Sequence, residues 1–209
     1  MSSYRLIFQI KIKNWYLSLS KLFLTKKRLI LQSENKSNQV TGQILTAEQI
    51  KQKIRRLAFE IYEENFEEKT IILAGIEGMG MILTKLLAEE LEKISPLEIT
   101  QICVRLDKLQ PTQSEVVLDC EPSIFENKSI VLIDDVLNTG RTLAYSLRPF
   151  LKVRIKELHT AVLIDRGHHS FPIAADFAGL RLSTTLQERI EVILYNEKDN
   201  GKKYGVYLH

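Results

Sequence analysis

The segment from Val131 to Thr142 has the sequence VLIDDVLNTGRT, and it limits what this 209-residue chain can fold into more than any other feature. Its first residues are apolar, as in a buried β-strand. A buried strand does not explain the adjacent carboxylates of Asp134 and Asp135 where the apolar run stops, because burying an unpaired charge is costly. We therefore expect both carboxylates to face a ligand.

The residues that follow the two carboxylates are suited to binding phosphate. They offer hydroxyl groups, a guanidinium and backbone N–H groups. A helix predicted to run from Leu143 to Leu151 would direct its free N–H groups and its positive dipole end to the same place. A ribose 5-phosphate fits this order of groups, whereas a solvated turn with a capping threonine is the plainer alternative. The candidate phosphate-binding residues are Asn138, Thr139, Gly140, Arg141 and Thr142.

Apolar periodicity predicts alternating strands and helices along the chain. Thr46 and Gln49 form a capping-box signature at the start of a helix over about residues 46–65, and helical spacing recurs from Ile82 to Leu91. This alternation predicts an α/β fold with a parallel sheet whose ligands bind beyond the carboxyl ends of the strands. The predicted strands are residues 70–74, 99–106, 116–118, 129–133 and 160–164.

A glycine-rich loop follows the first of these strands. It matches neither the dinucleotide-binding pattern GxGxxG nor the P-loop pattern GxxxxGK, so neither kind of site is predicted. A tight turn alone would also explain its glycines. The loop consists of Gly75, Ile76, Glu77, Gly78, Met79 and Gly80.

The segment 131–142 resembles the loop that binds phosphoribosyl pyrophosphate (PRPP) in type I phosphoribosyltransferases. Two more segments, LIDRGHHSFP at 163–172 and IAADFAG at 173–179, resemble the bifunctional pyrimidine operon attenuation regulator and uracil phosphoribosyltransferase family. The similarity extends from about Leu45 to the end of the chain. It implies the type I phosphoribosyltransferase fold, a mainly parallel sheet flanked by helices with a small hood.

The resemblance also implies what the site residues do. Asp134 and Asp135 would be the catalytic pair that holds the ribose hydroxyls near the developing oxocarbenium. The loop 75–80 would turn its backbone N–H groups toward pyrophosphate, although this chain has Gly78 and Met79 where the family typically has Thr-Arg. A mobile lid would follow the second strand, with Leu106 at the usual position of its arginine. The implied lid residues are Arg105, Asp107 and Lys108, and the implied base-binding residues are Asp165, Arg166, Phe177 and Ala178, with the ring of Phe177 stacked on the base.

The implied reaction is transfer of ribose 5-phosphate from PRPP to a free nucleobase, most simply uracil, to give UMP and pyrophosphate. Mg²⁺ is the implied cofactor, held mainly through PRPP rather than by direct side-chain ligation. Two alternatives stay open, namely a pyrimidine-responsive RNA-binding attenuation regulator with weak catalysis, and a purine-salvage phosphoribosyltransferase. Family members also lead us to expect a homo-oligomer, with a dimer favoured.

Charge is distributed unevenly along the chain. Residues 1–39 hold eight Lys or Arg and one Glu, a formal charge of +7, while the remainder holds 21 basic and 25 acidic residues, a formal charge of −4. We expect residues 1–43 to be a basic, poorly ordered extension and linker, and residues 44–209 to be the phosphoribosyltransferase domain. The acidic balance of the domain disfavours RNA binding, although Arg55, Arg56 and Arg181 remain as candidate contacts.

Two further features bear on the compartment. The chain has no run approaching the roughly 18 apolar residues of a membrane span. Cys103 and Cys120 lack metal-ligand spacing and are interpreted as reduced thiols. Together these features predict a cytoplasmic protein without a membrane span.

Overall fold

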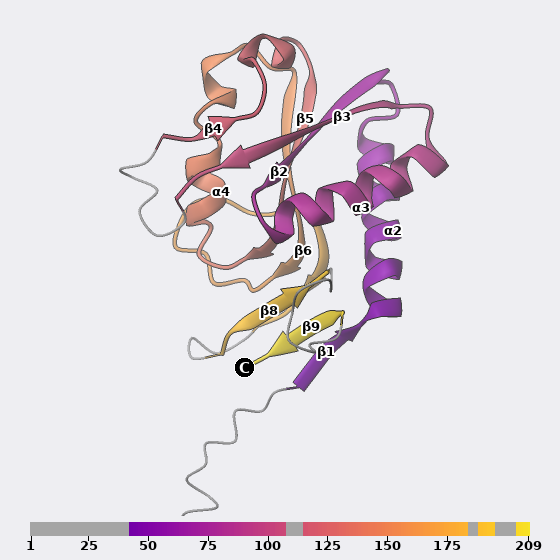
Figure 1. Ribbon diagram of the computed structural model, residues 1–209, viewed down its shortest axis with the longest axis vertical. Helices are drawn as coiled ribbons and strands as arrows, with labels where there is room; N and C mark the ends of the chain where they lie inside the picture. The colour runs from indigo at the N-terminus through magenta and orange to yellow at the C-terminus, as the bar shows by residue number, and fades with distance from the viewer. Residues whose placement is uncertain (1–41, 108–114, 184–187, 195–203) are drawn as a thin grey trace, which may run out of the picture. The chain divides into compact units, whose positions relative to one another are not determined.

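The computed structural model describes residues 42–107, 115–183, 188–194 and 204–209 (Figure 1). Most strands belong to a six-stranded sheet with the order β4-β3-β2-β5-β6-β7. These strands are β2 (Thr70–Ile76), β3 (Glu98–Arg105), β4 (Val117–Leu118), β5 (Ser129–Leu137), β6 (Glu157–Asp165) and β7 (Phe177–Arg181). The helices are α2 (Ala47–Glu64), α3 (Met79–Ile94) and α4 (Arg141–Ser146), with the 3-10 helices η1 (Pro122–Phe125) and η2 (Phe150–Lys152).

The six-stranded sheet is parallel except at one edge. The pairs β2–β3, β2–β5, β5–β6 and β6–β7 are parallel, and only β4 pairs antiparallel, with β3. The carboxyl ends of five strands therefore meet along one side of the sheet, which we call the carboxyl edge. The predicted α/β fold with a mainly parallel sheet is confirmed.

Helices cover both faces of this sheet, which explains why its central strands are continuous apolar runs. On β5, Val131 and Ile133 pack in the core shared with α2 and α3. The alternate residues Ile130 and Leu132 pack in a second core with α4 and the two 3-10 helices. A strand buried on both faces has no room for a charged side chain until it reaches the carboxyl edge.

Helix α2 begins where its sequence predicts. The Thr46 hydroxyl accepts a hydrogen bond from the Gln49 backbone N–H (3.3 Å), and the Gln49 side chain accepts one from the Thr46 N–H (2.9 Å). This reciprocal pair satisfies two N–H groups that the first turn leaves without helical partners. The predicted helix over about 46–65 is confirmed. No helix in the described ranges is long and apolar enough to cross a membrane.

Two elements differ from their predictions. Strand β5 continues to Leu137, so the two carboxylates lie within its last residues rather than after its end. Helix α4 ends at Ser146 instead of Leu151. Pro149 explains the early end because it has no N–H to donate to the Tyr145 carbonyl, which instead accepts from Arg148 (3.3 Å) in a tighter turn.

A separate antiparallel sheet with the order β1-β9-β8 forms the expected small hood. Its strands are β1 (Gly42–Thr46), β8 (Ile190–Ile193) and β9 (Gly205–Leu208). β1 leads directly into α2, and β8 contacts β5. β1 begins two residues before the boundary that we drew at residue 44. The rest of the predicted extension, up to residue 41, lies outside the described residues.

Candidate active site

The two carboxylates at the end of β5 have different environments. Asp134 is buried, with 4% of its surface exposed, whereas Asp135 is half-buried. The Asp135 N–H donates to Asp134 Oδ1 (3.0 Å). The first turn of α3 covers Asp134 so closely that a Cβ added at Gly80 would lie 3.1 Å from Asp134 Oδ1. Asp135 is therefore the more exposed of the two carboxylates, whereas Asp134 is the one that lines the pocket after β5.

The predicted phosphate residues line a single pocket. Its volume is about 120 Å³, and Asn138 to Leu143 form its wall together with the end of β5. Gly140 adopts a left-handed φ of 81°, which glycine tolerates without strain, and a Cβ there would lie 2.5 Å from Ile173 Cγ2. The Arg141 N–H points toward Thr139 Oγ1 (3.4 Å). α4 is only six residues long, so the groups that this pocket offers a ligand are hydroxyls, backbone N–H groups and Arg141 more than a helix dipole.

The segment 163–172 holds in place the candidate phosphate loop, by which we mean Asn138 to Thr142. The Thr139 carbonyl accepts hydrogen bonds from the backbone N–H groups of Ser170 (2.9 Å) and Phe171 (3.0 Å). The guanidinium of Arg141 lies 5.8 Å from the centre of the Phe171 ring. Sequence reasoning missed this support, since the contacts join residues about 30 positions apart. The motif at 163–172 thus positions the phosphate loop.

Arg166 links the phosphate loop to the hood. Its side chain is buried, with 7% exposure. Its backbone N–H donates to the Leu137 carbonyl (3.0 Å), Nη1 donates to Asn138 Oδ1 (3.0 Å), and Nη2 donates to the Glu188 carbonyl (2.7 Å) just before β8. These contacts make Arg166 a positioning residue for the phosphate loop. The Asn138 side chain, which we expected to contact phosphate, is hydrogen-bonded to Arg166 instead.

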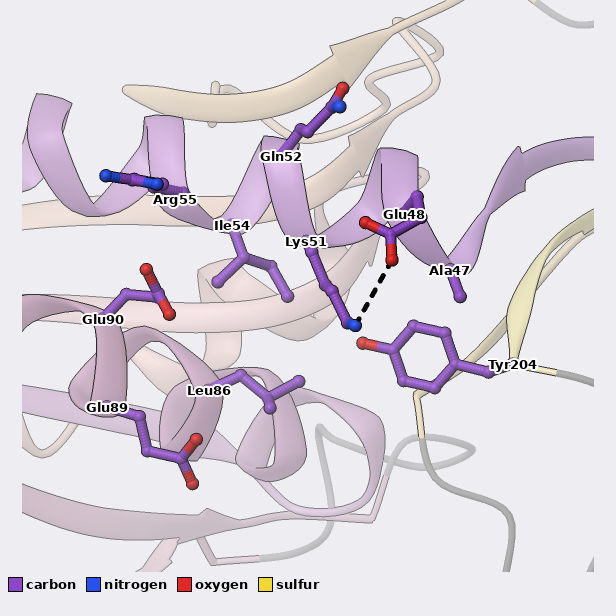
Figure 2. Close-up of a pocket in the computed structure, with 10 residues that line it drawn as sticks. All are labelled: Ala47, Glu48, Lys51, Gln52, Ile54, Arg55, Leu86, Glu89, Glu90 and Tyr204. Atoms are coloured by element: carbon purple, nitrogen blue, oxygen red, sulfur yellow. Dashed lines mark ion pairs between the residues drawn. The ribbon is translucent and has the colours of Figure 1, made fainter.

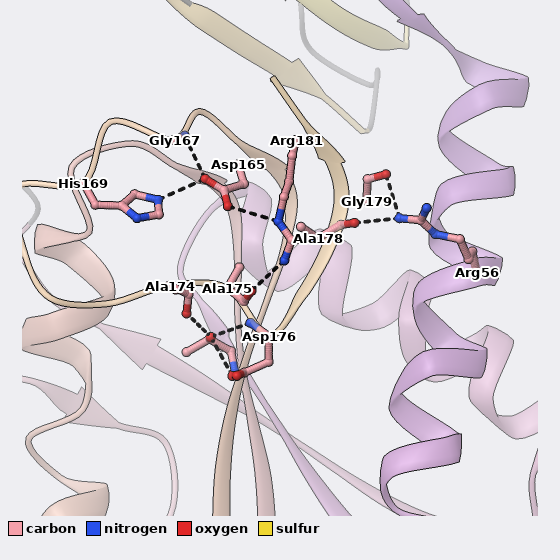
Figure 3. A network of polar contacts seen from close by, with 11 residues as sticks. Arg56, Asp165, Gly167, His169, Ala174, Ala175, Asp176, Ala178, Gly179 and Arg181 are labelled. Atoms are coloured by element: carbon pink, nitrogen blue, oxygen red, sulfur yellow. Dashed lines mark hydrogen bonds and ion pairs between the residues drawn. The ribbon is translucent and has the colours of Figure 1, made fainter. Parts of the chain in front are cut away.

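Asp165 organises the carboxyl edge between β6 and β7 (Figure 3). Its Oδ1 accepts from the Gly167 N–H (2.9 Å) and lies 3.0 Å from His169 Nε2, and its Oδ2 lies 3.6 Å from Arg181 Nε. Arg181 also donates to the Ala175 carbonyl (3.0 Å). These contacts place Asp165 beside the phosphate loop, at the edge where we expect the base, but with its oxygens already engaged.

Phe177 and Ala178 lie at the start of β7, and their predicted base-binding role stays a prediction. Register pairs Phe177 with Ala161 and Ala178 with Val162, and Val162 in turn pairs with Asp134. Phe177 is only 8% exposed and packs against the His159 ring (5.6 Å between centroids) in the core beneath α2. Burial of this large aromatic ring stabilises the fold.

The glycine-rich loop after β2 is shaped by close packing. A Cβ at Gly75 would lie 2.4 Å from Thr84 Oγ1 and 2.9 Å from Met81 Cα, so α3 could not approach β2 with any larger residue there. Gly78 caps α3 with a φ of 96° and has open space around it. The loop thus reaches the carboxyl edge beside Asp134, as the predicted pyrophosphate loop should.

The predicted lid is described in part. Arg105 ends β3, and its Nε lies 3.1 Å from Oε1 of Glu77 in the glycine-rich loop. Leu106, at the position of the usual lid arginine, is partly buried and packs on the core. Asp107 is exposed, and Lys108 lies outside the described residues. The structure therefore brings Arg105 to the glycine-rich loop and gives Leu106 a packing role.

A larger pocket of about 470 Å³ lies between α2, α3 and Tyr204 (Figure 2). Its wall includes surface charges such as the Lys51–Glu48 pair (3.5 Å) together with Leu86 and Tyr204. None of its lining residues comes from the strand ends of the six-stranded sheet. The convergence of carboxylates and phosphate-binding groups identifies the carboxyl edge, rather than this pocket, as the candidate active site.

Comparisons with known proteins agree with this geometry. Residues 40–193 match the family described as phosphoribosyl transferase domain. The chain is 36% identical over 171 residues to the Bifunctional protein PyrR of Caldicellulosiruptor bescii, which covers 77% of this chain and 92% of that protein. It is 35% identical over 173 residues to the Bifunctional protein PyrR of Bacillus pumilus, covering 78% and 96% respectively.

Solved structures share the fold at low identity. The hypoxanthine phosphoribosyltransferase of Trypanosoma cruzi matches with a TM-score of 0.66 and 16% identity over 80% of this chain and 95% of that one. A hypoxanthine-guanine phosphoribosyltransferase of Bacillus anthracis matches with a TM-score of 0.64 and 15% identity over 79% and 94%. The family match and the relatives show that the chain belongs to the phosphoribosyl transferase domain family. It is a phosphoribosyltransferase of the type I fold.

Proposed function

We propose that the protein transfers ribose 5-phosphate from PRPP to uracil, giving UMP and pyrophosphate. The observation that carries this proposal is the pocket built from Asn138 to Leu143 at the carboxyl edge, which Asp134 also lines, with the half-buried Asp135 next to Asp134 in β5. A ribose 5-phosphate bound with its phosphate in that pocket would place its ring toward this pair of carboxylates.

The reaction makes two opposite electrostatic demands on the site. As the bond between C1 of the ribose and pyrophosphate breaks, positive charge grows on the ring and negative charge grows on the leaving group. Asp135 would hold a ribose hydroxyl and stabilise the developing positive charge. Thr139, Arg141 and Thr142 would hold the 5-phosphate, so that binding energy remote from the reacting carbon fixes its position.

Mg²⁺ fits this site as a cofactor. Magnesium binds through one or two carboxylates together with phosphate oxygens, and Asp135 offers one such carboxylate beside the phosphate pocket. When bound, the ion would neutralise charge on the pyrophosphate. Most of its ligands would come from PRPP, as the sequence predicts.

The choice of uracil rests on the relatives rather than on a base pocket. The segments 163–179 resemble the pyrimidine regulator family, and the relatives named Bifunctional protein PyrR are 33–36% identical. The hypoxanthine-type structures share the fold at 15–16% identity. We also propose, from the same resemblance, that the protein acts as a homo-oligomer, with a dimer favoured.

The structure offers little support for the RNA-binding alternative. Two of the three arginines that remained as candidate contacts are engaged within the domain. Arg56 donates to the carbonyls of Ala178 (2.6 Å) and Gly179 (2.9 Å), and Arg181 contacts Asp165 and the Ala175 carbonyl. Arg55 is exposed, with its guanidinium 6.0 Å from the centre of the Phe59 ring. We therefore rank catalysis above RNA regulation.

Pyrophosphate release from PRPP tests the proposal. The full chain should release pyrophosphate fastest with uracil in a panel that also contains hypoxanthine, guanine and adenine. Faster release with a purine would move the protein to purine salvage. If none of the bases supports pyrophosphate release and the protein binds RNA in a sequence-selective, UMP-stimulated way, regulation would be its principal role.

A further inference from the structure

The glycine-rich loop carries an ion pair at the place where pyrophosphate is expected. β2 and β3 run in parallel with Ile76 opposite Val104, and the Glu77 N–H continues the ladder by donating to the Val104 carbonyl (2.9 Å). The next residues on the two strands are therefore neighbours, and Arg105 Nε lies 3.1 Å from Glu77 Oε1. Their side chains are 50% and 60% exposed, so the pair faces solvent at the carboxyl edge.

The charge of this loop is unusual for an anion site. Among residues 75–80 the sole ionisable side chain is the carboxylate of Glu77. Pyrophosphate carries several negative charges, and an adjacent carboxylate repels it. Arg105 lies beside the loop, and its Nε is occupied by Glu77. With the pair formed, the loop presents backbone N–H groups but little net positive charge.

The 5-phosphate pocket has the opposite character. Its lining includes Arg141 and the hydroxyl-bearing residues Thr139 and Thr142, together with one carboxylate, that of Asp134. A nucleoside 5-monophosphate needs this pocket alone for its phosphate, whereas PRPP needs both loops. The two ligands therefore depend differently on Glu77 and Arg105.

We infer that the Glu77–Arg105 ion pair determines ligand selection at this site, so that the paired state retains nucleoside 5-monophosphates in preference to PRPP. Binding of PRPP requires Arg105 to turn from Glu77 to the pyrophosphate group. This inference rests on the proposed function, because it assumes that both ligands place a phosphate in the pocket after β5.

Substitutions on the two sides of the pair should act in opposite directions. Glu77→Gln removes the repelling carboxylate and releases Arg105, so it should tighten PRPP and inorganic pyrophosphate roughly three- to tenfold, the range expected of half-exposed charges. Arg105→Gln leaves Glu77 without its partner at 3.1 Å and should weaken both by a similar factor of roughly three to ten. UMP affinity should stay within about twofold in both variants, because its phosphate lies in the other loop.

Calorimetric titration of the full chain with PRPP, pyrophosphate and UMP at fixed Mg²⁺ and ionic strength measures these effects. Glu48→Gln is the matched control, since it removes one exposed carboxylate from the Lys51–Glu48 pair on α2 and should change no affinity. All three variants lie at exposed positions, and melting temperatures check that they fold.

Two results would overturn the inference. If wild-type protein binds UMP and PRPP but Glu77→Gln leaves PRPP affinity unchanged, or changes UMP affinity equally, the ion pair does not select ligands and the proposed function stands. If wild-type protein binds neither UMP nor PRPP, the proposed function fails and the inference fails with it.

Discussion

The loops after β2 and β5 occupy equivalent places in the sheet and differ in chemistry. Each follows a buried parallel strand, contains a glycine with positive φ and begins a helix at the carboxyl edge. The β5 loop adds hydroxyls and the cation of Arg141, and Ser170 and Phe171 hold its backbone. The β2 loop adds only the carboxylate of Glu77. Topology thus brings both backbones to the carboxyl edge, while their side chains give the two loops different charges.

The glycines of the two loops also serve different ends. Gly75 and Gly80 allow α3 to pack on β2 and β5, where any Cβ would lie within 2.4 to 3.1 Å of atoms of the sheet or helix. Gly140 combines a left-handed backbone with a close approach to Ile173. Glycine content alone would suggest two similar phosphate loops. The packing shows instead that Gly75 and Gly80 allow α3 to lie close to the sheet.

The largest expected effect follows from Asp135→Asn. This change removes the half-buried carboxylate near the end of β5 and should lower kcat/KM for PRPP and uracil by about a hundredfold or more. The melting temperature should hardly change, because the side chain is half-buried at the edge and not in the core. Glu98→Gln, an exposed carboxylate at the opposite end of β3, is the control and should retain full activity. Near-normal turnover of Asp135→Asn would show that the ribose lies elsewhere.

Gly80→Ala tests the packing role of the β2 loop. The added methyl group would lie about 3.0 Å from the Ile133 carbonyl and 3.1 Å from Asp134 Oδ1, so α3 or Asp134 must shift. We expect a loss of about 1–3 kcal/mol in the free energy of unfolding, measured in urea, together with lower activity. Gly78→Ala meets no atom within 4 Å, so its cost of about 1–3 kcal/mol would come from backbone strain at φ 96° and ψ −132° alone. Unchanged stability of Gly80→Ala would contradict the packing explanation.

Arg166→Gln tests how the β5 loop is held. The variant loses the donors to Asn138 and to the Glu188 carbonyl, each worth roughly 1 kcal/mol or more when buried. UMP and PRPP should both weaken, by about tenfold, because both use the phosphate pocket. A drop in PRPP affinity alone would place Arg166 at the pyrophosphate instead. Arg166→Lys should rescue little, since a single ammonium cannot reach both acceptors in the same geometry.

Thr46→Ala should have the smallest effect and involves neither loop. Removing the capping hydroxyl of α2 should cost about 1 kcal/mol of stability in urea unfolding. Affinities for UMP and PRPP should be unchanged, because α2 starts beside the hood and away from the phosphate pocket. A change in either affinity would mean that the hood couples to the loops more strongly than the contacts indicate.

Sequence patterns predicted the helices and strands whose formation depends on residues close together in the chain. The capping box at Thr46 and the apolar spacing of α2 fix a helix within one segment, and the apolar run of β5 fixes a strand buried on both faces. The predicted end of α4 was wrong. Apolar spacing continues to Leu151, but Pro149 has no N–H to donate to the Tyr145 carbonyl in a continued helix. The signal for that correction was present in the sequence.

Other features depend on distant contacts and could not be read locally. The place of Phe177 in the sheet is set by strand register, which pairs it with Ala161. The links of Arg166 to Asn138 and Glu188, and of Arg105 to Glu77, join segments more than 20 residues apart. Only the folded arrangement shows these side chains to be neighbours.

Formation of UMP from PRPP and labelled uracil by the full chain tests the central claim most directly. We expect one UMP for each pyrophosphate released, with the product lost in Asp135→Asn and retained in Glu98→Gln. Absence of UMP from the wild-type reaction, or UMP formation that is indifferent to Asp135→Asn, would contradict the assignment of the carboxyl edge as the active site.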